Sequence, residues 1–255
     1  MLHQDPIQSL FIGSKQLKLP SCHSTNAVAA DLLAESATAE GTVIITDNQT
    51  AGKGQRGHTW ESQPGKNLTL SIILKPRFLA LTRQFDLTVV SSLALTNTLV
   101  DIGMPAPRIK WPNDIYYKGS KIAGILIENT VRSNILEWSI LGIGLNVNQS
   151  GFKTAGATSV KLELRDEVNL EWVLQNLLRR LNEYYAVLKS GRYRELRALY
   201  MERLMWLNEQ RTFLNIPLNT SFSGVIKRVS DQGKLIIAID NQQQAFDFRT
   251  ISFLH

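Results

Sequence analysis

Apolar residues recur along the chain with two different spacings, and these spacings predict both helices and strands. Apolar positions three and four residues apart predict helices over 24–33, 85–102, 170–188 and 193–207. Short runs rich in Ile, Leu and Val predict strands over 42–46, 68–74, 108–111, 115–117, 122–128 and 135–147. Helices beside strands with short turns favour an α+β fold with a mixed β-sheet over a doubly wound parallel sheet.

The pattern changes after residue 207, where helical spacing stops. Short strands separated by turns such as Asp231-Gln232-Gly233 are predicted over 211–216, 221–228, 234–239 and 244–248. A succession of short strands without helices is typical of a small β-barrel. We therefore expect two domains, residues 1–207 and residues 208–255.

Composition narrows the cellular setting and the chemistry. The chain has one cysteine, Cys22, so an internal disulfide and a cysteine-based zinc site are both excluded, and a reducing cytoplasm is expected. Beside His23 this cysteine is interpreted as a small buried residue rather than a nucleophile. No apolar run approaches the roughly 20 residues that a membrane helix needs, and residues 1–15 do not have the pattern of a secretion signal. The net charge of +6 fits a nucleic acid, an anionic small substrate or an acidic protein partner.

A polar stretch over 48–67 contains the sequence Gly52-Lys53-Gly54-Gln55-Arg56-Gly57. These residues fit the dinucleotide fingerprint G-x-G-x-x-G, but a strand follows instead of a helix, and no acidic residue stands about 20 positions on. We therefore reject a dinucleotide-binding loop. Glycines still expose backbone N–H donors, and Lys53 and Arg56 add positive charge, so the loop suits a carboxylate beside a phosphate. A solvated flexible loop is the alternative.

A second polar segment, Lys110-Trp111-Pro112-Asn113-Asp114, interrupts two predicted strands. Pro112 is expected to hold Trp111 extended. Asp114 can hold a metal bound to nucleotide phosphates, and Asn113 can hydrogen bond to a nucleotide.

Two further strands carry unusual residues. Lys121 opens an otherwise apolar strand, so it faces either solvent or a substrate anion, and Gly124 leaves room for a bound ring or chain. Gly142 and Gly144 indicate close backbone approach, with Asn146 as a polar group at the same place. A β-bulge with structural glycines is the alternative there.

Taken together, these stretches resemble the biotin protein ligases over nearly the whole chain from Ser24. The matching segments are Ser24-Thr25-Asn26, Gln49 with the loop 52–57, Lys110–Ile115 as the most specific, Lys121 with Ala123-Gly124, and Gly142–Val147. The resemblance implies a ligase core like that of class II aminoacyl-tRNA synthetases, followed by a small SH3-like domain. That domain is expected to help ATP or carrier binding without holding biotin.

The resemblance also implies a two-step reaction with ATP, Mg²⁺ and biotin. The biotin carboxylate attacks the α-phosphorus of ATP to give biotinyl-5'-AMP, and a lysine of the biotin carboxyl carrier protein domain of acetyl-CoA carboxylase then displaces AMP. No enzyme nucleophile is required. The family further implies a cytoplasmic enzyme that can form a homodimer. Only 23 residues precede Ser24, too few for the DNA-binding domain of some relatives, so no DNA partner is expected. The short apolar runs likewise lead us to expect no membrane partner.

The resemblance assigns site residues in three groups, and it leaves the metal ligands unknown. The catalytic residues are Lys53, Arg56 and Lys121. The biotin contacts are Ser24, Thr25, Asn26, Gln49, Lys53, Gly54, Gln55, Lys121 and Gly124. The ATP contacts are Gly52, Arg56, His58, Trp60, Lys110, Asn113, Asp114 and Asn146. Two family arginines are replaced, one by Lys53, which keeps the charge, and one by Gln55, which loses it.

Two alternatives remain at this point. A lipoate ligase or octanoyl transferase shares the logic of a carboxylate held by a lysine, but the segment 110–114 and the β-rich tail argue against it. A nucleic-acid-binding module would explain the basic charge and the small barrel. The tail, however, surrounds Phe246 and Phe248 mainly with Gln and Asp.

Overall fold

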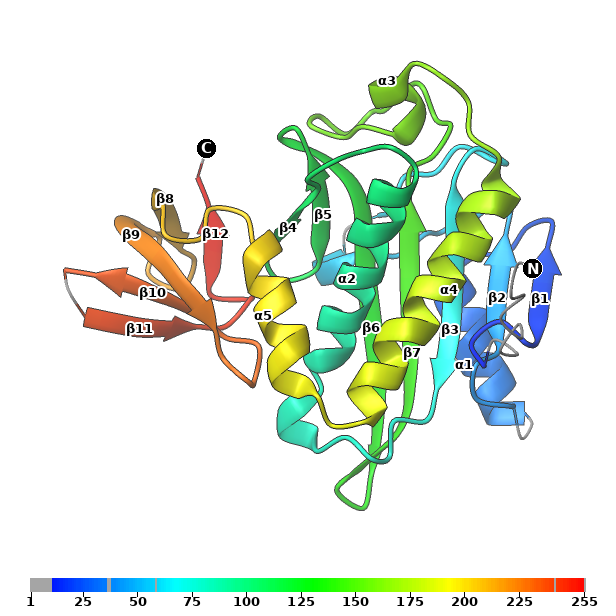
Figure 1. Ribbon diagram of the computed structural model, residues 1–255, viewed down its shortest axis with the longest axis horizontal. Coiled ribbons are helices and arrows are strands. Elements are labelled where there is room, and N and C mark those ends of the chain that lie inside the picture. Colours follow the sequence, from blue (N-terminus) through cyan, green and yellow to red (C-terminus); the bar gives the residue numbers. More distant parts are fainter. Residues whose placement is uncertain (1–10, 36–37, 58, 241, 255) are drawn as a thin grey trace, which may run out of the picture.

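The computed structural model describes residues 11–35, 38–57, 59–240 and 242–254. Its centre is a seven-stranded sheet in the order β1-β2-β3-β7-β6-β5-β4 (Figure 1). The strands are β1 (Gln16–Leu19), β2 (Val43–Thr46), β3 (Leu68–Leu74), β4 (Arg108–Lys110), β5 (Asp114–Tyr117), β6 (Ser120–Arg132) and β7 (Ile135–Leu145). β1 pairs with β2 in parallel and the other neighbours are antiparallel, which confirms the predicted mixed sheet.

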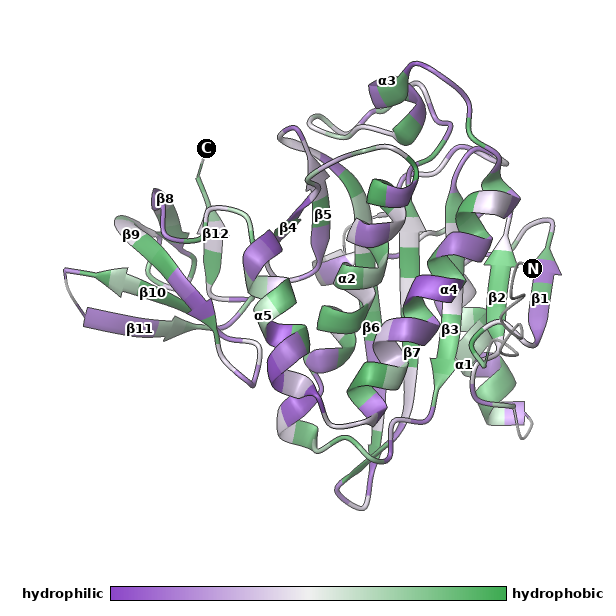
Figure 2. Ribbon diagram, in the orientation of Figure 1, coloured by the Kyte–Doolittle hydropathy of each residue, from purple (hydrophilic) through white to green (hydrophobic). Residues whose placement is uncertain are grey.

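Helices cover the two faces of this sheet unequally. One face carries α2 (Asp86–Asp101), α4 (Leu170–Lys189) and α5 (Tyr193–Arg203), which lie in front of the sheet in Figure 1. The other face carries α1 (Thr25–Glu35), which packs on β2, β3 and β7. Figure 2 shows hydrophilic residues on the outward side of α4 and hydrophobic residues along β2 and β3. The buried face of α4 follows helical spacing, as Leu174, Leu178 and Leu181 illustrate, because those positions lie on one side of a helix.

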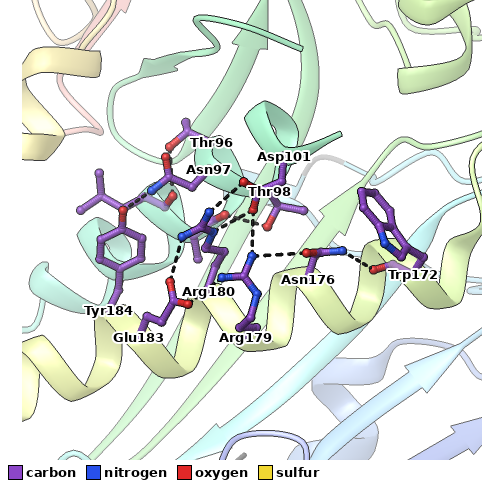
Figure 3. A network of polar contacts seen from close by, with 12 residues as sticks. Thr96, Asn97, Thr98, Asp101, Trp172, Asn176, Arg179, Arg180, Glu183 and Tyr184 are labelled. Carbon is purple, nitrogen blue, oxygen red and sulfur yellow. Dashed lines mark hydrogen bonds and ion pairs between the residues drawn. The ribbon is translucent and has the colours of Figure 1, made fainter. Parts of the chain in front are cut away.

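Ion pairs tie α4 to the end of α2 on the outer surface (Figure 3). Asp101 accepts from Arg179 at 3.0 Å and from Arg180 at 2.7 Å, and Arg180 also bonds Glu183 at 3.0 Å. The hydrogen bond from Arg180 is the main reason that the pKa of Asp101 is lowered. These side chains are partly exposed, so each pair contributes less than about 1 kcal/mol, and the helices are held mainly by their apolar faces.

A second, wholly antiparallel sheet follows at the C-terminal side, in the order β11-β10-β9-β8-β12. Its strands are β8 (Gln210–Asn215), β9 (Thr220–Val229), β10 (Leu235–Ile239), β11 (Gln242–Phe246) and β12 (Ile251–Phe253). Phe222 stacks between Phe213 and Phe246 inside it. This sheet confirms the predicted SH3-like addition to an α+β core.

The second sheet is joined to the first by hydrogen bonds and by apolar packing. Trp111 Nε1 donates to the carbonyl of Gly233 at 2.9 Å, and Arg197 of α5 donates to the carbonyls of Ser230 and Asp231, both at 2.9 Å. Buried apolar residues of both sheets form one continuous cluster. The β9–β10 turn, residues 230–233, is therefore part of the support of the 110–114 segment.

Two strands and one α-helix were not predicted from the sequence. They are β1, β12 and the short helix α3 (Val160–Leu164), and each is short or only partly apolar. The last helix ends at Arg203 rather than at 207, because Leu207 pairs with Ile226 of the second sheet. The strand predicted to include Trp111 ends at Lys110, Trp111 lies in a turn rather than in an extended strand, and the bond between Trp111 and Pro112 is cis. No helix within the described residues is long and apolar enough to span a bilayer.

Candidate functional site

A cavity of about 470 Å³ collects most of the predicted site residues. Its walls come from the start of α1, the loop after β2, the 110–114 segment, the central strands β6 and β7, and the end of the second sheet. Segments that lie more than two hundred residues apart thus meet around one space. Of the predicted residues, the cavity is lined by Ser24, Thr25, Asn26, Gln49, Lys53, Gly54, Gln55, Trp60, Lys110, Asn113, Asp114, Lys121, Gly124 and Asn146.

The end of the cavity at α1 is polar and buried. The backbone N–H of Thr25 donates to Gln49 Oε1 at 2.9 Å, which fixes the orientation of the Gln49 amide and leaves its NH₂ group to donate elsewhere. Thr25 and Asn26 are 3% and 5% exposed, so the polar atoms of a ligand that enters here leave bulk water and need hydrogen-bond partners from the protein. This end therefore suits a small ring that carries both hydrogen-bond donors and acceptors.

Glycines of β6 and β7 form the floor, and the ring of Trp60 lies on them. A Cβ on Gly144 would collide with the Trp60 indole, and one on Gly124 would come within 3.1 Å of it. The room predicted at Gly124 is thus taken by a ring of the protein itself. Trp60, predicted as an ATP contact, shares this floor with Gly124, a predicted biotin contact. Its Nε1 is buried and has no hydrogen-bond partner among the described residues.

Lys121 faces the cavity and is held by Asp114. Its Nζ lies 2.7 Å from Asp114 Oδ1 and 5.7 Å from the centre of the Trp60 ring. The side chains of Lys121 and Asp114 are 33% and 26% exposed, so both remain reachable by a ligand. Of the two orientations considered for Lys121, the one toward a substrate anion agrees with this geometry.

Lys110 lies in a cage of aromatic rings that joins the two sheets. Its Nζ is 4.9 Å from the ring centre of Tyr116, 5.6 Å from Trp206 and 5.4 Å from Phe253. It also donates to the Tyr116 hydroxyl at 3.4 Å. Burial lowers the pKa of Lys110, the charge of Lys121 lowers it further, and Asp114 raises it. Burial, with Asp114, raises the pKa of Tyr116 to about 12. An anion that enters here meets a poorly solvated cation, which strengthens their attraction.

The two asparagines of the predicted ATP set have different surroundings. Asn113 Nδ2 donates to the carbonyl of Ile125, and the Ile125 N–H donates back to the Asn113 carbonyl at 3.1 Å, so Asn113 fastens the 110–114 segment to β6. Asn146 Nδ2 donates to the carbonyl of Thr158 at 3.0 Å. Asn146 Oδ1 is buried and lacks a partner within the described part of the chain, so it is ready to accept from a ligand.

The glycine loop lies beside the cavity without starting an α-helix. Gln55–Gly57 forms a single 3₁₀ turn, which confirms the rejection of a dinucleotide fingerprint. Gly52 accepts from the N–H of Trp60 through its carbonyl at 2.9 Å and so helps to fix the indole. His58 and the side chain of Arg56 lie outside the described residues, and their predicted roles remain predictions.

Several residues at the cavity were missed by the sequence reasoning. Phe248, in the turn before β12, and Phe253 of β12 line it. Glu61 accepts from the N–H groups of Lys153 at 2.9 Å and Thr154 at 3.1 Å, which ties the loop before β3 to the loop after β7. Those backbone bonds, led by the one from Lys153, lower the pKa of Glu61. No cluster of three or more His, Cys, Asp or Glu suitable for a metal occurs in the described residues.

Comparison with known proteins places the chain among related ligases. Residues 19–146 match the Biotin/lipoate A/B protein ligase family. The biotin–[acetyl-CoA-carboxylase] ligase of Paracoccus denitrificans is 32% identical over 203 residues, which cover 76% of this chain and 82% of that protein. The bifunctional ligase/repressor BirA of Bacillus subtilis is 28% identical over 84% of this chain, and the match spans only 66% of that relative.

Solved structures agree with this match. A biotin protein ligase from Aquifex aeolicus, in complex with biotin and ATP, superposes with a TM-score of 0.79 and 25% identity, over 94% of this chain and 98% of that one. The likeness extends across both sheets, since it covers almost the whole of each chain. The chain therefore belongs to the Biotin/lipoate A/B protein ligase family.

Proposed function

We propose that this protein is an ATP-dependent ligase that activates biotin as biotinyl-5'-AMP and transfers it to a lysine of a biotin carboxyl carrier protein. The observation that carries the proposal is one continuous cavity, which joins the polar end at Thr25 and Gln49 to the cations of Lys121 and Lys110. It is supported by the relatives named as biotin–[acetyl-CoA-carboxylase] ligases and by the likeness to a ligase bound to biotin and ATP.

The first step must bring two anions into contact. An oxygen of the biotin carboxylate attacks the α-phosphorus of ATP, and the bond to the departing pyrophosphate breaks. Lys121 at the carboxylate and Lys110 at the phosphates reduce the repulsion between these groups, and the buried setting strengthens both interactions. Lys53 and Arg56 on the glycine loop are proposed to add charge at the same junction. Once Lys121 turns to the biotin carboxylate, the Asp114 carboxylate, which also lines the cavity, would hold Mg²⁺.

The second step needs an entering amine rather than a residue of this enzyme. The ε-amine of the carrier lysine attacks the activated carbonyl carbon, AMP leaves, and the amine loses a proton. The carrier domain of acetyl-CoA carboxylase is the proposed partner and the cytoplasm the proposed location. We further propose that residues 1–207 form the catalytic domain and residues 208–255 the SH3-like domain, in which Phe253 completes the cage of Lys110.

Intact-mass measurement of the carrier tests this function. The full chain is incubated with a carrier domain, biotin, ATP and Mg²⁺, and the carrier should gain one biotinyl group. The same mixture without ATP, and one with lipoate in place of biotin, serve as controls and should leave the mass unchanged. A carrier that gains mass with lipoate but not with biotin would favour the lipoate ligases of the same family.

A further inference from the structure

Below the polar end of the cavity, four side chains from three elements form a continuous hydrogen-bonded run. Glu128 of β6 accepts from Asn26 Nδ2 at 2.6 Å. Asn26 Oδ1 lies 2.6 Å from Ser71 Oγ of β3, and Ser71 Oγ lies 2.7 Å from Thr25 Oγ1. Ser71 is fully buried, whereas Glu128 is exposed at the outer end of the run.

The proton positions in this run follow from which atoms can only accept. Asn26 Nδ2 faces the Glu128 carboxylate and the carbonyl of Leu126, so the NH₂ group must lie on that side. Asn26 Oδ1 then faces Ser71 and can only accept. The Ser71 hydroxyl therefore donates its one hydrogen to Asn26 Oδ1. The 2.7 Å contact between the two hydroxyls must therefore be donated by Thr25. Gln49 Oε1 is a more distant acceptor for the same Thr25 proton, at 3.2 Å, and it already accepts the Thr25 N–H.

This arrangement leaves Asn26 with no role as a direct ligand contact. Both of its amide hydrogens have protein acceptors, and its oxygen accepts from Ser71. A Cβ on Gly142 would collide with Asn26 Oδ1, so this glycine makes room for Asn26 rather than for a ligand. The predicted biotin contact at Asn26 is better explained as support of Thr25.

We propose that Glu128, acting through Asn26 and Ser71, sets the direction of the Thr25 hydroxyl, so that Thr25 offers the ligand an acceptor and selects a ring N–H. Glu128, Asn26 and Ser71 are positioning residues, and Thr25 is the residue that touches the ligand. The inference rests on the proposed function, in which the ring is the cyclic urea of biotin. It adds that specificity for a ring N–H is controlled by an exposed carboxylate outside the cavity.

Reversing the direction of hydrogen-bond donation along these four side chains tests the proposal. In Glu128→Lys the new ammonium can only donate, so Asn26 turns its oxygen outward and its NH₂ toward Ser71. Ser71 then donates to Thr25, and the Thr25 proton is released toward Gln49 and the ligand. Thr130→Lys is the matched control, because Thr130 is exposed two residues further along the same strand and on the same side of it.

The measurement is titration calorimetry of each full-length variant with biotin and with the two cyclic carbamate analogues, in which one ring N–H is replaced by a ring oxygen. Wild type and Thr130→Lys should prefer biotin over the carbamate analogue in which the ring N–H that faces Thr25 is replaced by oxygen. Glu128→Lys should bind biotin about 5- to 150-fold more weakly and lose that preference. Glu128→Gln, which permits both amide orientations, should lose part of the preference.

The outcomes separate this inference from the function on which it rests. A wild-type protein that fails to bind biotin would overturn the proposed function. Biotin binding by wild type, with affinity and preference unchanged in Glu128→Lys, would leave the function standing and refute the role of Glu128. If Glu128→Lys does not fold, the Glu128→Gln variant decides: an unchanged preference refutes the proposal, and a reduced preference supports it.

Discussion

The ion pair between Lys121 and Asp114 leads to a prediction with opposite signs for its two partners. Lys121 Nζ bonds Asp114 at 2.7 Å, so a biotin carboxylate must take over a cation that is already paired. Removing Lys121 should therefore weaken biotin binding. Removing the charge of Asp114 should strengthen it, because the competitor for Lys121 disappears.

The magnitude follows from the exposure of the pair. A charge-assisted hydrogen bond contributes roughly 1.5–3 kcal/mol, but Lys121 is 33% exposed and solvent screens part of that value. Lys121 also loses its bond to Asp114 when it binds the carboxylate, and this loss offsets part of the remaining free energy of binding. We expect Lys121→Ala to weaken biotin binding by about 1.5 kcal/mol, near tenfold. Asp114→Asn should tighten it by up to about 1 kcal/mol, at most fivefold.

Titration calorimetry with biotin in the absence of ATP measures both effects, and the double variant closes a mutant cycle. Lys118→Ala is the control, since Lys118 pairs with Glu163 and does not line the cavity. Asp114→Asn should nevertheless slow ligation, because Asp114 is the group proposed for Mg²⁺. Equal weakening by Lys121→Ala and Asp114→Asn would refute the reasoning, since the pair would then act as a structural unit.

Three further predictions concern the segment 110–114 and the glycine loop. Trp111→Phe removes the bond to the Gly233 carbonyl and should lower the free energy of unfolding by about 1–3 kcal/mol; an unchanged urea midpoint would contradict it. Because the pKa of Lys110 is lowered, its cation is lost as pH rises at a lower pH than for an ordinary lysine. Lys110→Arg should shift the alkaline decline of ligation upward, and identical pH–rate profiles would exclude Lys110 as its source. Gln55→Arg should slow release of pre-formed biotinyl-5'-AMP by about 1 kcal/mol, near fivefold, because it restores an ionic donor; equal dissociation rates would mean that Gln55 does not set retention.

The parts of the site that could be predicted are those whose functional residues lie close together in the sequence. Lys110–Asp114, Lys121 and the loop at Gly52–Gly57 each carry their chemistry within a few residues, and most of them line the cavity. The resemblance to the biotin protein ligases, built on these segments, is confirmed by the family match over residues 19–146. The mixed sheet was predictable as well, since helical and strand spacings alternate along the first 207 residues.

The remainder depends on contacts between distant segments. Ser71 stands among apolar neighbours in β3, and nothing local indicates that it meets Asn26 of α1, the helix packed on this face of the sheet. The ring of Trp60 lies on Gly144 because of tertiary packing, which the order of the residues does not reveal. Phe253 reaches Lys110 only after β12 pairs with β8, and the sequence showed no strand at that position.

The position of β12 has a consequence for the timing of synthesis. A ribosome completes the polar end, the glycine floor and both lysines long before it reaches residues 248–253, which form the last wall of the cavity. A nascent chain can therefore hold most of the catalytic groups while the cage of Lys110 still lacks Phe253. The aromatic cage around Lys110 is therefore complete only when β12 adds to the edge of β8.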